Sequence, residues 1–377
     1  MLGVPEIKQY KKYFVLPSFV GRNKKASLMY IKERIWSKLR GWKEKLLSQA
    51  SKEVLLKAVI QAILAYSMSS FKLPINIFHE IETLIRKFWW GQQGERRKVH
   101  WVKWSRLCRS KHVGGLGFRE LQKFNDALLA KQVWRLMSNQ DSLFFKIFKS
   151  KFFPHENVLD SKENRGSFAW KSILKDRDII WRGMRWRIGD GSFVHIYHDS
   201  WLSSDRFGKV LSPIMDISPD ATVSILIDHE FCCWRTLDID KLFIPSKATV
   251  IKAIPLSFSR RSDTVFWPRN RNGLYSVKSG NKLLLEEEDL EKTSVSQLNA
   301  MKVVWNGIWK LRVPNHIRTL IYRAGVDALP TKANLVKKRL STNAICHHYN
   351  LKPEDTLHAP WSYPLLSEVW QGHFSCL

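Results

Sequence analysis

Three runs of apolar residues recur at helical spacing within the first 90 residues, and this spacing constrains the fold more than any other feature of the chain. In residues 24–47, Ile31, Ile35, Leu39, Trp42 and Leu46 follow one another at steps of three or four, so they line one face of a helix. Similar stripes run through 51–67 and 75–90. Consecutive helices with short connections predict a helical subdomain.

The remaining segments predict further helices with a small share of strand. Helical spacing recurs in 120–137, 167–183 and 304–323, and residues 186–202 alternate around a Gly-Asp-Gly turn at 189–191. Because Asp-Gly between alternating residues is typical of hairpins, we expect a β-hairpin there. The acidic, polar stretch 285–297 predicts an exposed loop. The fold class is therefore mainly α with short β-hairpins, an α+β arrangement.

Positive charge dominates the composition. The chain has 62 Lys and Arg against 34 Asp and Glu, a formal net charge of +28. Residues 1–200 hold 39 basic and 17 acidic residues, whereas residues 201–377 hold 23 and 17. A basic surface together with 17 Trp predicts a polyanionic partner, RNA or DNA, bound through phosphate contacts and base stacking.

Basic residues cluster in three places, and these clusters are the candidate nucleic-acid contacts. One lies on the first helix, one in the polar loop after the third helix, and one in a short basic helix near the C-terminus. The candidates are Lys24, Lys25, Lys32, Lys38, Lys43, Lys45, Arg96, Arg97, Lys98, Lys337, Lys338 and Arg339.

The cysteines and the apolar runs exclude other classes. Five cysteines at irregular spacing do not form a disulfide framework and fit a reducing compartment. No run of about 18 apolar residues occurs, so we expect no membrane span and no membrane partner. The N-terminal residues lack the apolar centre of a signal peptide.

Several strings in a fixed order resemble one family. They are YFVLPSFVGRNKKAS (13–27), GWKEKLLSQASKEVLLKAVIQAI (41–63), FKLP (71–74), GGLGFRELQKFNDALLAKQVWRL (114–136), WRIGDGSFVHIYHDSWL (186–202), GLYSVKSG (273–280) and WKLRVPNHIRTLIYRAGVDALPTKANL (309–335). Together they resemble the region downstream of the polymerase core in plant LINE-type, non-LTR retrotransposon reverse transcriptases.

The resemblance implies a division of the chain. Residues 1–150 correspond to a helical, thumb-like or connection-like region downstream of the polymerase palm, which we expect to be missing. Residues 151–272 form a mixed linker region with the hairpin, 273–370 a small helical domain resembling the reverse-transcriptase zinc-binding domain, and 371–377 a tail. The resemblance also implies nuclear or cytoplasmic residence, without deciding between them.

The family's zinc ligands are incomplete in this chain. The resemblance aligns the usual Cys-x-x-Cys, His and Cys ligands with Cys346, Tyr349, His358 and Tyr363. Four ligands normally close a structural zinc site, and neutral tyrosine is a poor ligand. Each tyrosine codon differs from a cysteine codon by one G-to-A change, which suggests decay. We therefore expect a degenerate site at Cys346 and His358 and no bound cofactor.

We interpret the chain as a non-catalytic, nucleic-acid-binding remnant rather than an enzyme. Polymerases hold two metal ions on clustered carboxylates, and the Asp-Asp dipeptide typical of the family is absent. The alternatives are a protein-interaction module, whose partner would be another reverse transcriptase copy, a translated relic without function, or part of an active reverse transcriptase if the true gene includes the palm.

Overall fold

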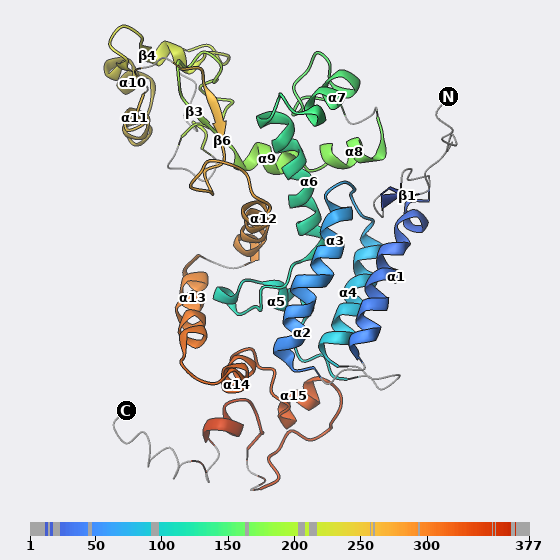
Figure 1. Ribbon diagram of the computed structural model, residues 1–377. Helices are drawn as coiled ribbons and strands as arrows, with labels where there is room; N and C mark the ends of the chain where they lie inside the picture. Colours follow the sequence, from blue (N-terminus) through green and yellow to red (C-terminus); the bar gives the residue numbers. More distant parts are fainter. Residues whose placement is uncertain are drawn as a thin grey trace, which may run out of the picture. The chain divides into compact units, whose positions relative to one another are not determined.

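The computed structural model describes most of the chain. Its described residues are 12–13, 16–17, 23–43, 47–91, 98–162, 166–202, 208–210, 217–256, 258, 261–292, 295–348, 350, 352–362 and 366. Contacts between residues that lie close in space divide the molecule into two compact units, whose helices and strands are drawn in Figure 1. Unit 1 comprises Met1–Ser67, Leu73–Lys123 and Leu285–Leu377, and unit 2 comprises Met68–Lys72 and Phe124–Leu284. These units follow contacts rather than chain order, so the boundaries expected at 150 and 272 stay predictions.

Unit 1 is built almost entirely from helices. They are α1 (Lys24–Lys43), α2 (Gln49–Leu55), α3 (Gln61–Met68, whose last residue belongs to unit 2), α4 (Ile75–Trp89), α5 (Trp104–Cys108), α13 (Val295–Lys310), α14 (Asn315–Gly325) and α15 (Lys332–Lys337). Short helical turns add η1 (Leu56–Ile60), η2 (Lys111–Val113) and η4 (His358–Ser362). Two short strands, β1 (Lys12–Tyr13) and β2 (Leu16–Pro17), pair antiparallel.

The core of unit 1 follows the apolar stripes seen in the sequence. Ile31, Ile35 and Leu39 of α1 are at most 2% exposed, and α1 packs against α4. Ile77 and Ile81 of α4 are fully buried. Each such side chain stabilises the unit by roughly 1.5–3 kcal/mol relative to an exposed position. The three predicted N-terminal helices are confirmed, with the second continuous as α2, η1 and α3.

Unit 2 holds the remaining helices and four short strands. Its helices are α6 (Leu121–Ser138, whose first three residues belong to unit 1), α7 (Leu143–Phe152), α8 (Phe168–Leu174), α9 (Arg177–Gly183), α10 (Thr236–Leu242), α11 (Pro245–Lys252) and the first half of α12 (Val277–Lys292). Its strands are β3 (Arg185–Arg187), β4 (Ile227–Asp228), β5 (Cys233–Trp234) and β6 (Thr264–Phe266), and η3 (Val223–Leu226) precedes β4. The predicted class, mainly α with short β pairs, is confirmed.

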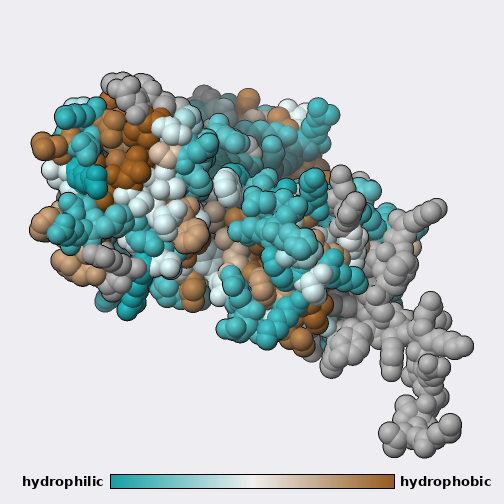
Figure 2. All heavy atoms as spheres, turned by 90° about the horizontal axis from the view of Figure 1, so that it is seen from above, coloured by the Kyte–Doolittle hydropathy of each residue, from teal (hydrophilic) through white to brown (hydrophobic). Residues whose placement is uncertain are grey.

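Two apolar clusters support unit 2. One surrounds Trp170 and Trp267, which are 1% and 0% exposed. The other includes Trp201 and Trp234 and supports the short hairpin β4–β5, in which Ile227 lies opposite Trp234. Apolar side chains also reach the surface here: Figure 2 shows them gathered over the part of unit 2 that holds β4 and α10, where Phe231 is 70% and Leu237 76% exposed.

The hairpin predicted at 186–202 is wrong. Strand β3 pairs with the distant β6, with Trp186 opposite Val265. The turn at 189–191 is bound by Asp263, whose Oδ1 accepts from the amides of Gly189 at 2.7 Å and Gly191 at 3.0 Å. The carboxylate of Asp263, remote in sequence, thus accepts hydrogen bonds from backbone amides that would otherwise bind water in a hairpin turn.

The exposed loop predicted at 285–297 is also wrong. Most of it belongs to α12 and α13, which leave only residues 293–294 between them. Strong helix formers such as Leu and Glu fill the stretch. Within unit 1, Asp289 pairs with Arg109 at 3.0 Å and Glu288 pairs with Lys123, so the acidic face of α12 is bound to cations rather than to solvent.

A buried ion triad holds the loop before α4 within unit 2. Lys72 Nζ donates to Asp126 at 2.7 Å and to Asp176 at 2.6 Å, and Asp176 is 6% exposed. Nearby, the buried amide of Asn125 donates to the carbonyls of Met68 and Phe71. One ammonium faces two carboxylates, so the triad retains excess negative charge when both acids are ionised.

None of the helices in the described part of the chain is both long and apolar enough to span a bilayer.

The triad gives the fold a dependence on pH. Burial, and then Asp126, raise the pKa of Asp176 from 3.8 to about 7, although Lys72 opposes the change. Because the folded state binds the proton of Asp176 more tightly than the unfolded state does, the protonated carboxyl stabilises the fold below pH 4. This contribution to the unfolding free energy is lost as pH rises towards 7. We expect Asp176→Asn to flatten the fall in unfolding free energy between pH 4 and 7, measured by urea denaturation. Asp178→Asn, at an exposed position of α9, should retain the wild-type slope; a wild-type slope in Asp176→Asn would contradict the assignment.

Candidate nucleic-acid interface

The lysines predicted on the first helix differ in their surroundings. Lys25 and Lys32 both pair with Glu80 of α4, at 2.8 and 2.6 Å. Hydrogen bonds from Lys25 and then Lys32 lower the pKa of Glu80 to about 2, so it stays ionised as their partner. Lys24 and Lys38 are exposed, whereas Lys45 and the side chain of Lys43 lie outside the described residues. Lys25 and Lys32 therefore share one carboxylate, which offsets one of their two positive charges.

The loop after α4 brings two lysines together. Arg96 and Arg97 lie outside the described residues, but Lys98 is described and exposed. A Cβ built at Gly91 (φ 74°) would lie 3.3 Å from Lys52 Nζ and 3.7 Å from Lys98 Nζ, so both ammonium groups gather at this glycine. Burial lowers the pKa of Lys52, and the charge of Lys98 lowers it further.

Cations from three further positions approach the same segment. Lys338 Nζ donates to the carbonyl of His100 at 2.9 Å. Burial lowers the pKa of His100, and Arg86, Lys338 and Lys87 lower it further by their charge. We call Lys52, Arg86, Lys87, Lys98 and Lys338 the basic cluster. Within the described residues, none of its four lysines forms an ion pair with a carboxylate.

The C-terminal candidates separate from one another. Lys337 pairs with Asp327 at 2.7 Å, whereas Lys338 joins the basic cluster. Arg339 is exposed, with a φ of 57° just after α15. The structure thus brings Lys338 to His100, two residues after Lys98, although 240 positions separate Lys98 from Lys338 in the sequence.

A hollow of about 760 Å³ lies beside the basic cluster within unit 1, and we call it the aromatic hollow. Its lining includes five aromatic side chains, from α4, the segment after it, α13 and α14: Trp89, Trp90, Trp101, Trp309 and Tyr322. It also includes four basic side chains, Lys98, Lys111, Arg318 and Arg323, and one acidic side chain, Glu53. Flat aromatic faces and a net positive lining are suited to an anion that carries a ring.

Close packing of α13 on η2 forms one wall of the hollow. Gly114 (φ 82°) leaves room for Trp305, because a Cβ there would lie 2.7 Å from the indole ring. Trp309 Nε1 donates to the carbonyl of Lys111 at 3.0 Å, and the Lys111 ammonium lies 4.9 Å from the Trp309 ring centroid. Trp309 is therefore held in place by groups that belong to the fold.

The acidic side chain of the lining is compensated. Glu53 Oε1 accepts from Lys57 at 2.6 Å and lies 3.7 Å from Lys111 Nζ. Arg318 of α14, by contrast, has no carboxylate partner of this kind in the described part of the chain. Its guanidinium donates to the carbonyls of Leu311 and Val313, two residues of the segment between α13 and α14, and these bonds fix its position. Its buried Nε has no hydrogen-bond partner within the described residues.

A second hollow, of about 520 Å³, has a different charge balance. Its lining contains the acidic residues Glu120, Glu288 and Asp289 among basic side chains. Arg109 pairs with Asp289, and Lys123 pairs with Glu288 and Glu120. This lining holds three acidic side chains against the four basic ones Lys103, Arg106, Arg109 and Lys338, so it is less positive than that of the aromatic hollow, which is the better candidate for a phosphate.

Sequence reasoning missed the residues of α13 and α14 that line the aromatic hollow. Trp309, Arg318, Tyr322 and Arg323 lie in a string interpreted as part of the zinc-binding segment, not as a binding surface. The spacing of Arg318 and Tyr322, four residues apart on one helix, was the available signal. That they face residues from α4 and the segment after it depends on tertiary packing.

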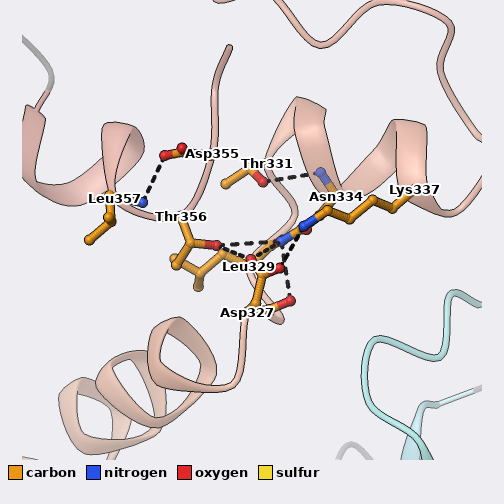
Figure 3. A network of polar contacts seen from close by, with 8 residues as sticks. All are labelled: Asp327, Leu329, Thr331, Asn334, Lys337, Asp355, Thr356 and Leu357. Carbon is orange, nitrogen blue, oxygen red and sulfur yellow. Dashed lines mark hydrogen bonds and ion pairs between the residues drawn. The ribbon is translucent and has the colours of Figure 1, made fainter.

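The segment that should carry zinc is held by hydrogen bonds. The amide of Cys346 donates to the carbonyl of Lys352, and the amide of Glu354 donates to Ala344, closing the turn between them. Figure 3 shows the polar network between α15, the residues before it and the residues that follow this turn: Asn334 Nδ2 donates to Asp327 Oδ1 at 2.9 Å and to the Leu329 carbonyl at 3.1 Å. Thr356 Oγ1 donates to Asp327 at 2.6 Å.

The residues that the structure describes around Cys346 do not supply a closed zinc site. Cys346 and His358 are 2% and 5% exposed. Tyr349, Tyr363 and Cys376 lie outside the described residues. Among the residues that the structure describes, no three His, Cys, Asp or Glu side chains come together as a metal-binding group. A structural zinc needs four ligands, so the described donors fall short of such a site.

Comparison with known proteins adds three findings. Residues 275–370 match a family described as zinc-binding in reverse transcriptase. A provisionally named ribonuclease H protein of Arabidopsis thaliana is 29% identical over 375 residues, which are 96% of this chain and 59% of that protein. An uncharacterized mitochondrial protein of Arabidopsis thaliana is 38% identical over 146 residues, which are 38% of this chain and 95% of that protein. The chain thus spans less than two thirds of the first relative.

Proposed function

Because this chain belongs to the plant retrotransposon reverse-transcriptase family and corresponds to its C-terminal region, we propose that it binds RNA or DNA without catalysing polymerisation. The observation that carries the proposal is the basic cluster, in which four lysines gather around Gly91 and His100 without carboxylate partners in the described residues. Like charges held together repel one another, and a phosphate backbone relieves that repulsion while releasing counterions.

The lysines outside the cluster differ from it in a way that supports this proposal. Lys25, Lys32 and Lys72 each bind carboxylates of the fold. Lys72 faces two carboxylates, and Lys25 and Lys32 share one, so the fold offsets part of their positive charge before any ligand binds. The cluster lysines lack such partners, so a polyanion gains most from them.

The absence of catalysis is a separate proposal. It is supported by the missing Asp-Asp dipeptide and by the state of the adjacent acids Asp126 and Asp176, whose shared cation is the Lys72 ammonium. A carboxylate pair that already holds a lysine is poorly suited to hold the two metal ions of phosphoryl transfer.

A second candidate function is a protein-interaction module. The exposed apolar side chains Ile225, Phe231 and Leu237 of unit 2 favour it, because a contiguous apolar surface commonly marks a protein interface. Its occupant would be another reverse-transcriptase copy. Self-association that does not weaken in salt, measured by sedimentation, would favour this alternative over nucleic-acid binding.

Binding should depend steeply on salt. We expect a single-stranded 20-mer to bind the full chain with log K falling linearly with log salt concentration, by about 0.7 per phosphate neutralised. Lys52→Gln with Lys98→Gln should reduce the slope by about 1.4, measured by fluorescence anisotropy. The matched control, Lys25→Gln with Lys32→Gln, removes the same formal charge from lysines paired with Glu80 and should change the slope less. No binding in dilute buffer would refute the proposed function.

Primer extension tests the catalytic part. We expect the purified chain to add no labelled nucleotide to a primed RNA or DNA template in the presence of magnesium or manganese. A reverse transcriptase assayed on the same template is the positive control. Incorporation that survives repurification of the chain would show that it carries polymerase activity.

We further propose that the segment around Cys346 folds without zinc, held by the Asn334 network. Treatment with EDTA should leave the unfolding free energy unchanged, and the chain should contain no stoichiometric zinc by atomic emission. Asn334→Ala should lower stability by about 1–3 kcal/mol, because buried acceptors lose their donor. Asn299→Ala, at an exposed position of α13, is the matched control. One zinc per chain together with destabilisation by EDTA would overturn this proposal.

A further inference from the structure

The aromatic hollow has features that the basic cluster alone does not explain. Phosphate binding requires cations, yet five aromatic side chains line this hollow of about 760 Å³. A volume of that size lies within the usual range for small-molecule sites. Trp309 lies 5.4 Å from Tyr322 at an angle of 36°, and both are positioned by α13 and α14. Trp90 stacks on His100 at 6.0 Å on the α4 side.

The charges of the lining select an anion. Lys98, Lys111, Arg318 and Arg323 contribute positive charge, and the acidic Glu53 already binds Lys57 and lies close to Lys111. Arg318 adds a guanidinium of fixed position to the lining, because the carbonyls of Leu311 and Val313 accept from its Nη2 atom. A fixed cation binds an anion without the cost of ordering a mobile side chain.

An unpaired nucleotide combines both properties. Its base has flat faces that stack on indole and phenol rings, and its phosphate is an anion with several acceptor oxygens. The bases of a duplex are already stacked on one another, so only a single strand, a bulge or a frayed end can present one. An acidic peptide would satisfy the cations but would leave most of the aromatic surface without a flat partner.

We propose that the aromatic hollow binds one unpaired nucleotide of a single strand, with the base against Trp309 and the phosphate against Arg318 and Lys98. This inference rests on the proposed nucleic-acid binding and deepens it. The basic cluster attracts the backbone, and the hollow distinguishes unpaired bases from paired ones. The chain would therefore favour single strands and duplex ends over continuous duplex.

The test compares single-stranded ligands of equal charge and adds a duplex. Full-length protein is titrated with labelled oligo(dT), oligo(U), a duplex and an abasic oligonucleotide, each with 12 phosphates on the labelled strand. Stacking of one base should make oligo(dT) or oligo(U) bind about 5- to 150-fold more tightly than the abasic strand. Tighter binding of either oligo(dT) or oligo(U) than of the abasic strand supports base binding in the hollow. The tighter of the two shows whether the nucleotide comes from DNA or RNA. Binding should also quench tryptophan fluorescence.

Two variants assign that preference to the hollow. Trp309→Leu keeps an apolar side chain but removes the ring, so the ratio between oligo(dT) and the abasic strand should fall towards one while the salt slope is retained. Trp181→Leu, at a 43% exposed position of unit 2, is the matched control and should leave the ratio unchanged. Arg318→Gln provides a second variant and should weaken both ligands while leaving fluorescence quenching at saturation. Circular dichroism confirms that each variant is folded.

The outcomes separate the two proposals. If no oligonucleotide binds in dilute buffer, the proposed function fails. If oligo(dT), oligo(U) and the abasic strand bind equally, nucleic-acid binding stands but the hollow does not recognise a base. A ratio in Trp309→Leu equal to the wild-type ratio would likewise overturn the inference, as would an acidic peptide of equal charge that displaces oligo(dT) as effectively as unlabelled oligo(dT) does.

Discussion

Repulsion between the ammonium groups of Lys52 and Lys98 beside Gly91 is the constraint on which the proposed function of this chain depends. The fold compensates other lysines with carboxylates: Glu80 holds Lys25 and Lys32. Among the described residues, no carboxylate forms an ion pair with a lysine of the basic cluster. Positive charge that packing does not cancel remains available to a ligand, and the cluster borders the aromatic hollow through Lys98.

The segment that the family uses for zinc also combines groups that the fold already pairs with groups that could bind a ligand. Its two potential ligands, Cys346 and His358, are buried, but the turn that carries Cys346 is closed by backbone hydrogen bonds. The amide of Asn334 connects the residues before α15 to those after the turn, with donors and acceptors already matched. Metal coordination and hydrogen bonding are alternative ways to fix such a small, loop-rich region.

Particular residues show how far the sequence led toward the site. Charge alone pointed to Lys98 and Lys338, and both lie in the basic cluster. It pointed equally to Lys25 and Lys337, which the fold pairs with Glu80 and Asp327. Composition cannot separate these cases, because pairing depends on which carboxylate packs nearby. Trp309 and Arg318 were missed since their partners across the hollow are remote in sequence.

The amino-acid sequence by itself determined the helices of unit 1, because the spacing of Ile31, Ile35 and Leu39 fixes a buried face whatever surrounds it. It also determined the excess of cations and placed Tyr349 and Tyr363 at two positions where the resemblance expects zinc ligands. Only the tertiary structure decided that β3 pairs with β6, that the acidic stretch of α12 is helical, and which cations stay uncompensated. Local patterns carry information over a few residues, whereas strand pairing, ion pairing and a shared hollow arise from groups that are distant along the chain and adjacent only after folding.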